Sequence, residues 1–472
     1  MNKPRNLVAV DFGAESGRLV LCRWNGSEGT LEEIHRFPNG AQPVDHHLVW
    51  EVDRLWEEVL RGLLKAATKT DGHLDSVGVD GWGVDYTLLD AAGNRIGYPY
   101  CYRDARNVPA MGKTFSKVSR DRMYEITGIQ LLPFNTVYQL MAHVEEFPQE
   151  WERAALWLTL PEYFHYRLTG AIAAEYTQAS TTQLLNVRTR SWSPELASAL
   201  GLSLEKFPPI VQAGTLLGKL RREVTEEVGL ADTQVIAPAC HDTGSAVAGI
   251  PFSHEGSAFI SSGTWSLVGT VLLNPVVSVT EQGKLFTNEG GVAGSIRFLQ
   301  NVIGLWLLQE CLREWNGEGR RLTAADLAGQ CLETPAEGPY FQAGATTYLA
   351  PGNMVDRINA GLRAAGFPEE RRPPELAAII FRSLARRYAE VLDELVKLSG
   401  KSIQRICIVG GGVKNEALNR LTEKVTGIEV VRGPSESTAA GNIAVQIAAL
   451  ENAVSLDQIQ AISAKLKFGS TT

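Results

Sequence analysis

The sequence predicts an α/β protein built from two domains that share one architecture. Short apolar runs that end in glycine-containing turns are typical of buried strands in such proteins. A unit of strand, glycine turn and returning strand occurs twice, at residues 7–22 and 258–271. Each unit precedes a third strand and helices with an apolar face. We therefore expect domains at 1–249 and 250–472, with a boundary close to Gly249.

In the first half the order of the predicted elements is strand, strand, strand, helix, strand. Asn25–Gly26 predicts a hairpin turn, because both residues tolerate positive φ. Asp53 is expected to cap a helix whose apolar face recurs from Leu55 to Ala67. Residues 100–235 show weak strand periodicity and are expected to form an insertion of helices and loops. The strands are expected at 7–10, 19–22, 31–37 and 76–80.

The second half repeats the opening order. A helix is expected to begin near Val302, and Pro373 is expected to start a long helix that Gly400 ends. Further helices are expected from about Asn415 and from about Glu436. The strands are expected at 258–261, 266–271, 295–299, 406–409 and 428–431.

Composition excludes several classes of protein. The 472 residues are 44% hydrophobic, which is enough for a large core, and the formal net charge is −8. Such a balance argues against nucleic-acid and anionic-membrane partners. Apolar runs are too short for a membrane span or for the core of a signal peptide. Six scattered cysteines without a CxxC pair favour reduced thiols and a cytoplasmic location over disulfides or zinc.

Asp242 is the first candidate for chemistry. It follows a short apolar run and precedes a helix-like run within Pro238–Gly249. In an α/β sheet this is the edge where ligands bind, and a carboxylate there could accept a proton from a substrate hydroxyl. The alternative is that Asp242 merely caps the helix through its side-chain oxygen. This segment alone leaves both interpretations open.

Two glycine turns are candidates for binding phosphate. Glycine lets the backbone approach a ligand closely, and unpaired N–H groups attract anions. In the turn of Asp11–Arg18, Ser16 adds a hydroxyl, Arg18 adds a cation, and Asp11 could hold Mg²⁺ through water. The second turn is Ser262–Trp265. Ordinary β-turns are the alternative, but their matching positions in a repeat favour a shared role.

A third glycine segment, Gly410–Asn415, follows a buried strand and opens a helix. This placement suits close approach of a nucleotide to the backbone. The segment matches neither the Walker A pattern nor GxGxxG, so those mechanisms do not apply. A tight strand-to-helix turn remains the alternative.

Together these motifs resemble those of the FGGY carbohydrate kinases, within the actin-like ATPase superfamily. The likeness runs in the family's order from about residue 5 to residue 450 and includes Ile408–Gly412 and Glu436–Asn442. It implies two actin-like ATPase (ribonuclease H-like) domains that flank a catalytic cleft. It also implies ATP-dependent phosphorylation of a sugar, with Mg²⁺ accompanying ATP.

The resemblance implies roles for individual residues. Asp242 corresponds to the catalytic base. The implied sugar contacts are Gly83, His241, Asp242, Thr243 and Asn301. The implied ATP contacts are Ala14, Glu15, Ser16, Gly17, Arg18, Thr264, Gln309 and Gly411.

Further stretches resemble one group of ketose kinases within the family. The resemblance implies L-rhamnulose as the sugar and its C1 hydroxyl as the acceptor. Alternatives are a kinase for another ketose such as L-fuculose, or a sugar- or nucleotide-binding regulator without catalysis. The stretches are 79–85, 102–104, 128–139, 166–170 and 301–309.

Overall fold

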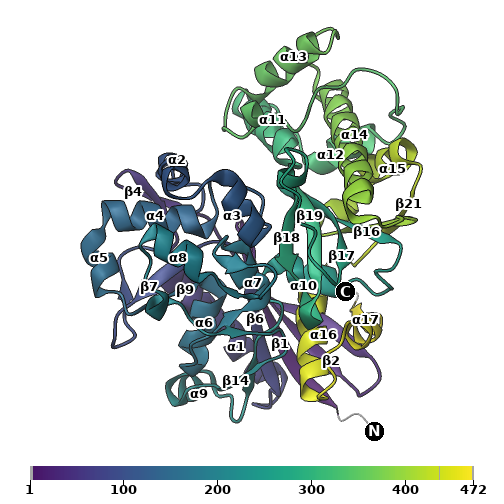
Figure 1. Cartoon of the computed structure of the whole chain (residues 1–472). Helices are drawn as coiled ribbons and strands as arrows, with labels where there is room; N and C mark the ends of the chain where they lie inside the picture. The colour runs from purple at the N-terminus through teal and green to yellow at the C-terminus, as the bar shows by residue number, and fades with distance from the viewer. Residues whose placement is uncertain (1–3, 435, 470–472) are drawn as a thin grey trace. The chain divides into compact units, whose positions relative to one another are not determined.

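The computed structural model describes residues 4–434 and 436–469, which form two compact units, each with a mixed β-sheet (Figure 1). The first unit contains the chain up to Phe252, Leu272–Arg297 and the residues from Ser437 onward. The second unit contains Ser253–Val271 and Phe298–Glu436. The first segment thus ends near the expected boundary, whereas two later segments group with the first unit rather than with the second.

Both faces of the first unit's sheet are covered by helices, and successive residues of a strand point to opposite faces. Val8 and Val10 of its strand β1 pack in one cluster with helix α1 (Val52–Lys69). Leu7 and Ala9 pack in another with helix α16 (Ser437–Leu450). A strand covered on both faces needs apolar residues in both registers, which explains the continuous apolar run. In the described residues the sheet order is β14 (Leu216–Lys219), β15 (Gln234–Ile236), β6 (Ser76–Gly81), β1 (Arg5–Phe12), β2 (Ser16–Trp24), β3 (Gly29–Pro38) and β22 (Leu466–Phe468).

Residues 100–235 are mostly helical, as predicted, but the expected insertion of helices and loops is only partly right, because the region also supplies β14 and the start of β15 to the central sheet. The helices are α2 (Asn107–Lys117), α3 (Arg120–Thr127), α4 (Thr136–Glu146), α5 (Pro148–Arg153), α6 (Leu160–Thr169), α7 (Tyr176–Thr181), α8 (Pro194–Leu200) and α9 (Arg222–Val228). The remaining helices of the first unit are α10 (Asp242–Ala248) and α17 (Leu456–Ser463). Its shorter strands are β4 (Gln42–Val44), β5 (His47–Val49), β7 (Tyr86–Leu89), β8 (Arg95–Ile96), β9 (Leu156–Thr159), β10 (Ala174–Glu175), β11 (Leu185–Asn186), β12 (Ser191–Trp192), β13 (Ile210–Val211) and β18 (Thr287–Gly290).

The second unit repeats the pattern of an antiparallel pair beside parallel strands. Strand β16 pairs antiparallel with β17 and parallel with β20. The strands follow the order β19 (Ile296–Ile303), β17 (Trp265–Leu272), β16 (Ser257–Ser262), β20 (Arg405–Val409) and β21 (Glu429–Arg432). The helices are α11 (Trp306–Gly317), α12 (Ala324–Gln330), α13 (Met354–Ala364), α14 (Pro373–Ser399) and α15 (Glu416–Thr426).

The observed ends of helices α1, α11 and α14 can be compared with those predicted from the local sequence. Helix α14 begins at Pro373 and ends at Gly400 in the left-handed conformation, as predicted. The predicted helix start near Val302 is wrong, because β19 continues to Ile303 and α11 begins at Trp306. The predicted cap is wrong as well, since Asp53 lies inside the first turn of α1 and Glu51 precedes the helix. An apolar run alone does not distinguish a strand from a buried helix.

Two further observations concern the chain as a whole. Within the described residues, every helix is too short or too polar to cross a lipid bilayer. The six cysteines are all buried and form no disulfide.

Candidate active site

The turn between β1 and β2 is fixed by its own backbone and by one asparagine. The Gly13 amide donates to the Ser16 carbonyl at 2.9 Å, and the side-chain amide of Asn39 donates to the Gly13 carbonyl at 2.8 Å. A side chain on Gly17 would overlap the ring of Phe37. The predicted phosphate-binding residues thus lie in a tightly held turn and at the start of β2.

Asp11 and Arg18 form an ion pair across this turn. They lie opposite each other in the antiparallel register of β1 and β2. The Arg18 Nε and Nη2 atoms donate to Asp11 Oδ2 at 2.9 and 2.6 Å. Sequence reasoning assigned Arg18 to the nucleotide and missed this pair. The signal was present, because residues on either side of a hairpin turn face one another across the strands.

The donor set near Asp11 fits a water-mediated metal better than a direct one. Among residues 4–434 and 436–469, no three His, Cys, Asp or Glu side chains converge to hold a metal ion. Mg²⁺ prefers oxygen ligands but usually keeps several waters, so one carboxylate is sufficient. Asp80 faces Asp11 in the parallel register of β1 and β6. Burial, together with the nearby Asp11 charge, raises the pKa of Asp80 well above its ordinary value.

The end of β6 joins the segment that carries Asp242. The Gly81 amide donates to the Cys240 carbonyl at 2.9 Å, and Gly81 forms a parallel bridge with His241. This pairing brings the following loop, residues 82–85, next to His241. A Cβ on Gly83 would lie 3.2 Å from His241 Nε2, so only a small residue leaves space there.

A buried carboxylate holds this loop in an unusual conformation. Asp85 accepts hydrogen bonds from the indole nitrogens of Trp50 and Trp82 at 2.6 and 2.9 Å, and from Gln139 Nε2 at 2.9 Å. Burial raises the pKa of Asp85 to about 6, although these bonds oppose the shift. Val84 has φ 71°, which is rare for a β-branched residue and marks a strained backbone. Sequence reasoning gave Asp85 no role.

Asp242 is the first residue of α10 rather than its N-cap. The N-cap is His241, whose side chain makes no capping hydrogen bond. Asp242 Oδ1 accepts bonds from the amide and the hydroxyl of Thr243, at 2.5 and 3.2 Å. The Asp242 side chain is still 31% exposed. Desolvation raises the pKa of Asp242, and the neighbouring His241 partly offsets this. A reachable carboxylate with a raised pKa is suited to accept a proton.

Buried polar groups fix the backbone around Asp242. The Cys240 amide donates to Glu175 Oε2 at 2.9 Å, and the His241 amide donates to Thr177 Oγ1 at 3.1 Å. From the other side, α16 approaches α10 so closely that a Cβ on Gly441 would overlap the Ser245 carbonyl. The sequence gave no indication of Glu175 or Thr177, because both are distant from Asp242 along the chain.

In the second unit, the structure brings Thr264 and Gln309 into one region. The Thr264 carbonyl, in the turn from β16 to β17, accepts bonds from the Gly304 and Trp306 amides at 3.1 and 3.2 Å. Gln309 lies one turn further along α11. Its Oε1 atom is buried and has no hydrogen-bond partner among the described residues. An unsatisfied buried acceptor of this kind is suited to a ligand.

Gly411 lies in the turn after β20, which borders the same end of the sheet. Gly410 has φ 78°, and a Cβ on Gly412 would overlap the Ser262 side chain. A Cβ on Gly411, in contrast, would meet nothing within 4 Å. The flanking glycines are therefore required by the fold, whereas Gly411 presents an open backbone surface.

The predicted sugar residues are divided between the units. Gly83, His241, Asp242 and Thr243 belong to the first unit, where they lie close together. Asn301 lies on β19 in the second unit.

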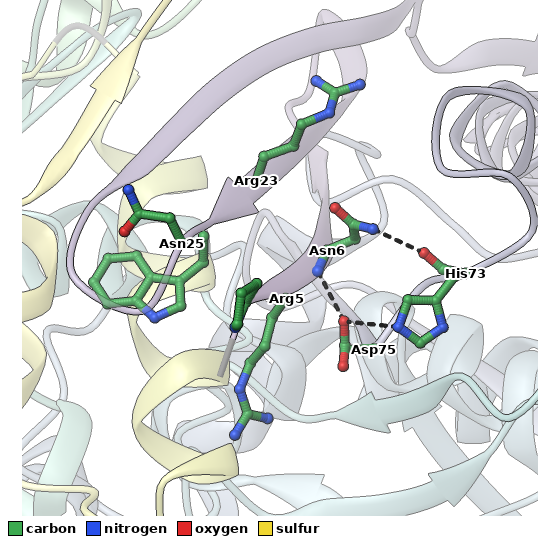
Figure 2. A pocket seen from close by; sticks show the side chains of 8 residues that line it. Arg5, Asn6, Arg23, Asn25, His73 and Asp75 are labelled. Atoms are coloured by element: carbon green, nitrogen blue, oxygen red, sulfur yellow. Dashed lines mark hydrogen bonds and ion pairs between the residues drawn. The ribbon is translucent and has the colours of Figure 1, made fainter. Parts of the chain in front are cut away.

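A separate surface pocket of about 290 Å³ lies where β1 begins (Figure 2). The Asn6 amide donates to Asp75 Oδ2 at 2.8 Å, and the Asn6 side chain donates to the His73 carbonyl at 3.1 Å (Figure 2). None of the predicted site residues lines this pocket.

The first unit thus presents a carboxylate at a strand end, and each unit has a glycine turn between two antiparallel strands. The chain belongs to the FGGY family of carbohydrate kinases: the models of the family's N-terminal and C-terminal domains match residues 6–249 and 258–450.

Curated relatives named rhamnulokinase are similar over almost the whole chain. The rhamnulokinase of Klebsiella pneumoniae subsp. pneumoniae is 40% identical over 464 residues, which cover 97% of this chain and 92% of the relative. That of Bacteroides thetaiotaomicron is 40% identical over 446 residues, covering 94% of this chain and 90% of the relative.

Solved structures confirm the predicted fold class. A xylulose kinase from Rhodospirillum rubrum has a TM-score of 0.80 at 15% identity and covers 97% of this chain and 92% of its own. A gluconate kinase from Lactobacillus acidophilus has a TM-score of 0.78 at 17% identity, with the same two coverages of 97% and 92%. The fold is therefore the two-domain, actin-like ATPase fold of these sugar kinases.

Proposed function

We propose that this protein transfers the γ-phosphoryl group of ATP to the C1 hydroxyl of L-rhamnulose, giving L-rhamnulose 1-phosphate and ADP. The observation that carries the chemistry is the partly exposed carboxylate of Asp242, placed beside His241 and the Gly83 loop. The choice of sugar is supported by the similarity to rhamnulokinases over almost the full chain.

Asp242 is the proposed general base. It accepts the proton of the C1 hydroxyl while the C1 oxygen bonds to the γ-phosphorus, and the bond from that phosphorus to the bridging oxygen of ADP breaks. Phosphoryl transfer of this type depends on positioning and charge neutralisation, so one base is sufficient. Gly83, His241, Thr243 and Asn301 are the proposed sugar contacts.

The proposed nucleotide contacts are residues 14–18, Thr264, Gln309 and Gly411. In terms of domains, 1–249 supplies the base, most sugar contacts and the first phosphate turn, and 250–472 supplies the second phosphate turn and the adenosine turn. Mg²⁺ bound with ATP neutralises charge on the phosphates. Asp11, already held by Arg18, is suited to contact that ion through water. Six buried, unpaired cysteines support a cytoplasmic location.

A substrate panel tests the proposal. ADP release is measured with a coupled assay at fixed ATP and Mg²⁺ for L-rhamnulose, L-fuculose, L-xylulose, D-xylulose and glycerol. L-Rhamnulose should give the highest kcat/KM, because a site that matches a set of hydroxyls rejects analogues that leave its own groups unpaired. A clear preference for L-fuculose or D-xylulose would refute the choice of sugar. Absence of sugar-dependent ADP release would refute the kinase itself and favour a regulator.

A further inference from the structure

We infer that Arg297 is a positioning residue that fixes the tautomer of His241, so that His241 meets the sugar as a hydrogen-bond donor through Nε2. The inference rests on the proposed function for the location of the sugar beside Asp242. The central contact joins Arg297 Nη2 to His241 Nδ1 at 2.9 Å. Both residues belong to the first unit, which includes the first two residues of β19, Ile296 and Arg297.

Arg297 is itself held firmly. Its side chain is completely buried, and its Nε atom donates to the Gly290 carbonyl at 2.8 Å. Its Nη1 atom lies 3.1 Å from Glu289 Oε2. A buried arginine is costly unless its charge is paired, and Glu289 supplies the opposite charge while Gly290 accepts from Nε. The guanidinium therefore presents Nη2 to His241 in one orientation.

The chemistry of this contact decides where the imidazole proton lies. A guanidinium has donors and no acceptor, so His241 Nδ1 must offer its lone pair to Arg297. In a neutral imidazole the proton is then on Nε2. Glu289 Oε2 also lies 3.4 Å from Nδ1, but the shorter contact is with the arginine.

The position of His241 Nε2 allows its proton to be donated to a ligand beside Asp242. His241 Nε2 is 3.5 Å from Asp242 Oδ1 and 3.2 Å from the place that a Cβ on Gly83 would take. A donor therefore lies directly beside the carboxylate that is proposed to take the C1 proton. A sugar oxygen on the carbon next to C1 would accept this hydrogen bond and hold the C1 hydroxyl toward Asp242.

The tautomer can be observed without any sugar. Histidine ¹⁵N labels are recorded by NMR at pH 8, and the His241 signals are assigned from their absence in His241→Gln. The wild-type protein should show a protonated Nε2 and an unprotonated Nδ1. In Arg297→Met the two tautomers should mix. A wild-type spectrum with a protonated Nδ1, or with mixed tautomers, would overturn the inference.

Kinetics separate positioning from a general structural effect. Arg297→Met should lower kcat/KM for the sugar about tenfold or more, the effect of one lost hydrogen bond, with the KM for ATP unchanged. Arg297→Lys keeps a charged donor and should recover part of the loss. The matched control is Arg382→Met, which removes another buried arginine, one that donates to the Pro335 and Pro339 carbonyls in the second unit. Equal losses toward sugar and ATP in Arg297→Met would show a structural role only.

A second pair of variants keeps the test valid if Arg297→Met does not fold. A glutamine amide nitrogen can occupy the place of Nε2, whereas an asparagine amide nitrogen lies nearer that of Nδ1. His241→Gln should therefore retain about tenfold more sugar kcat/KM than His241→Asn. Equal activity of the two would overturn the donor role. If the wild-type protein releases no ADP with any sugar, the proposed function fails, while the NMR result on the tautomer still stands.

Discussion

Asp242 is affected both by the residue next to it in the sequence and by groups distant in the sequence. Its bonds to Thr243 come from its own helix start, and they keep the carboxylate in place. Its raised pKa comes from desolvation, and the charge of Asp11, far away in the sequence, adds to the shift. The first set of contacts is compatible with a helix-terminal role, but only the second makes the group a suitable base.

Replacing Asp242 by asparagine keeps the shape of the side chain and removes the base. We expect kcat to fall about 10²–10⁴-fold, the usual range for general-base catalysis. Nucleotide affinity should change little, because the proposed role of Asp242 is toward the sugar. Sugar-dependent ADP release and a separate nucleotide dissociation constant measure the two effects. Near-normal turnover would show that Asp242 is not the base.

The pH dependence of the reaction follows from the same residue. A base must be ionised, and the pKa of Asp242 is raised by desolvation. The sugar kcat/KM should therefore fall as the pH drops through this raised pKa, and this acid limb should lie above the value of an ordinary aspartate. A pH profile of kcat/KM checks the position of the limb. An acid limb at or below the ordinary value would contradict the prediction.

A substitution at Gly411 tests whether its open backbone surface contacts the nucleotide. The space above it is open, so Gly411→Val should fold normally and yet weaken ATP binding by crowding the backbone surface. Sugar affinity should be retained. Separate dissociation constants for nucleotide and sugar provide the measurement. The contrasting variant is Gly412→Ala, which should lower stability because its Cβ would overlap Ser262. An unchanged nucleotide constant in Gly411→Val would remove Gly411 from the site.

At the scale of elements, the loop after β6 depends on one buried carboxylate. The Asp85 oxygens accept three N–H groups and hold the strained backbone at Val84. The loop that contains Gly83 is thus shaped by a hydrogen bond within itself and by hydrogen bonds from two other segments.

Asp85→Asn should disturb this loop specifically. In either orientation the new amide group faces an N–H donor, which costs about 1–3 kcal/mol for the unsatisfied buried groups. We expect a raised KM for the sugar, little change in the KM for ATP and a lower melting temperature. Asp71→Asn, at an exposed turn position with φ 50°, is the control and should leave all three unchanged. Equal sugar affinity in Asp85→Asn and wild type would exclude a role for the loop's conformation.

At the scale of the whole molecule, the first unit is completed by the end of the chain. Helix α16 lies against β1 and β6, and its Gln446 and Asn442 form hydrogen bonds with backbone and side-chain groups of these strands. Gln446 Nε2 donates to the Val8 carbonyl at 3.0 Å, and its Oε1 accepts from Ser76 Oγ at 2.6 Å. The first unit therefore cannot be obtained by cutting the chain at Gly249.

Gln446→Ala should destabilise the first unit without touching the proposed contacts. It leaves the Ser76 hydroxyl and the Val8 carbonyl buried without their partner, at about 1–3 kcal/mol for each group. Denaturant unfolding should show a lower midpoint. Exposed Gln282→Ala serves as the control and should not shift it. A Gln446→Ala midpoint equal to that of the wild type would show that this network adds little.

Much of the fold could be predicted from short stretches of sequence. Apolar runs, the Asn25–Gly26 turn and the Pro373 and Gly400 ends of α14 act through contacts over a few residues, so they are readable locally. The start of α11 could not be placed, because an apolar run near Val302 is compatible with a strand or a helix. Whether this run forms a strand or a helix depends on pairing with another strand, which is distant in the sequence.

The order of the strands and glycine turns, and with it the family resemblance, can be inferred from the sequence alone. Which polar groups meet depends on the folded chain. The motif around Arg18 predicts a phosphate contact but not the ion pair with Asp11, and nothing local connects Arg297 to His241. The physical reason is that hydrogen bonding, burial and the resulting pKa shifts depend on neighbours in space, which the chain supplies from segments far apart in sequence.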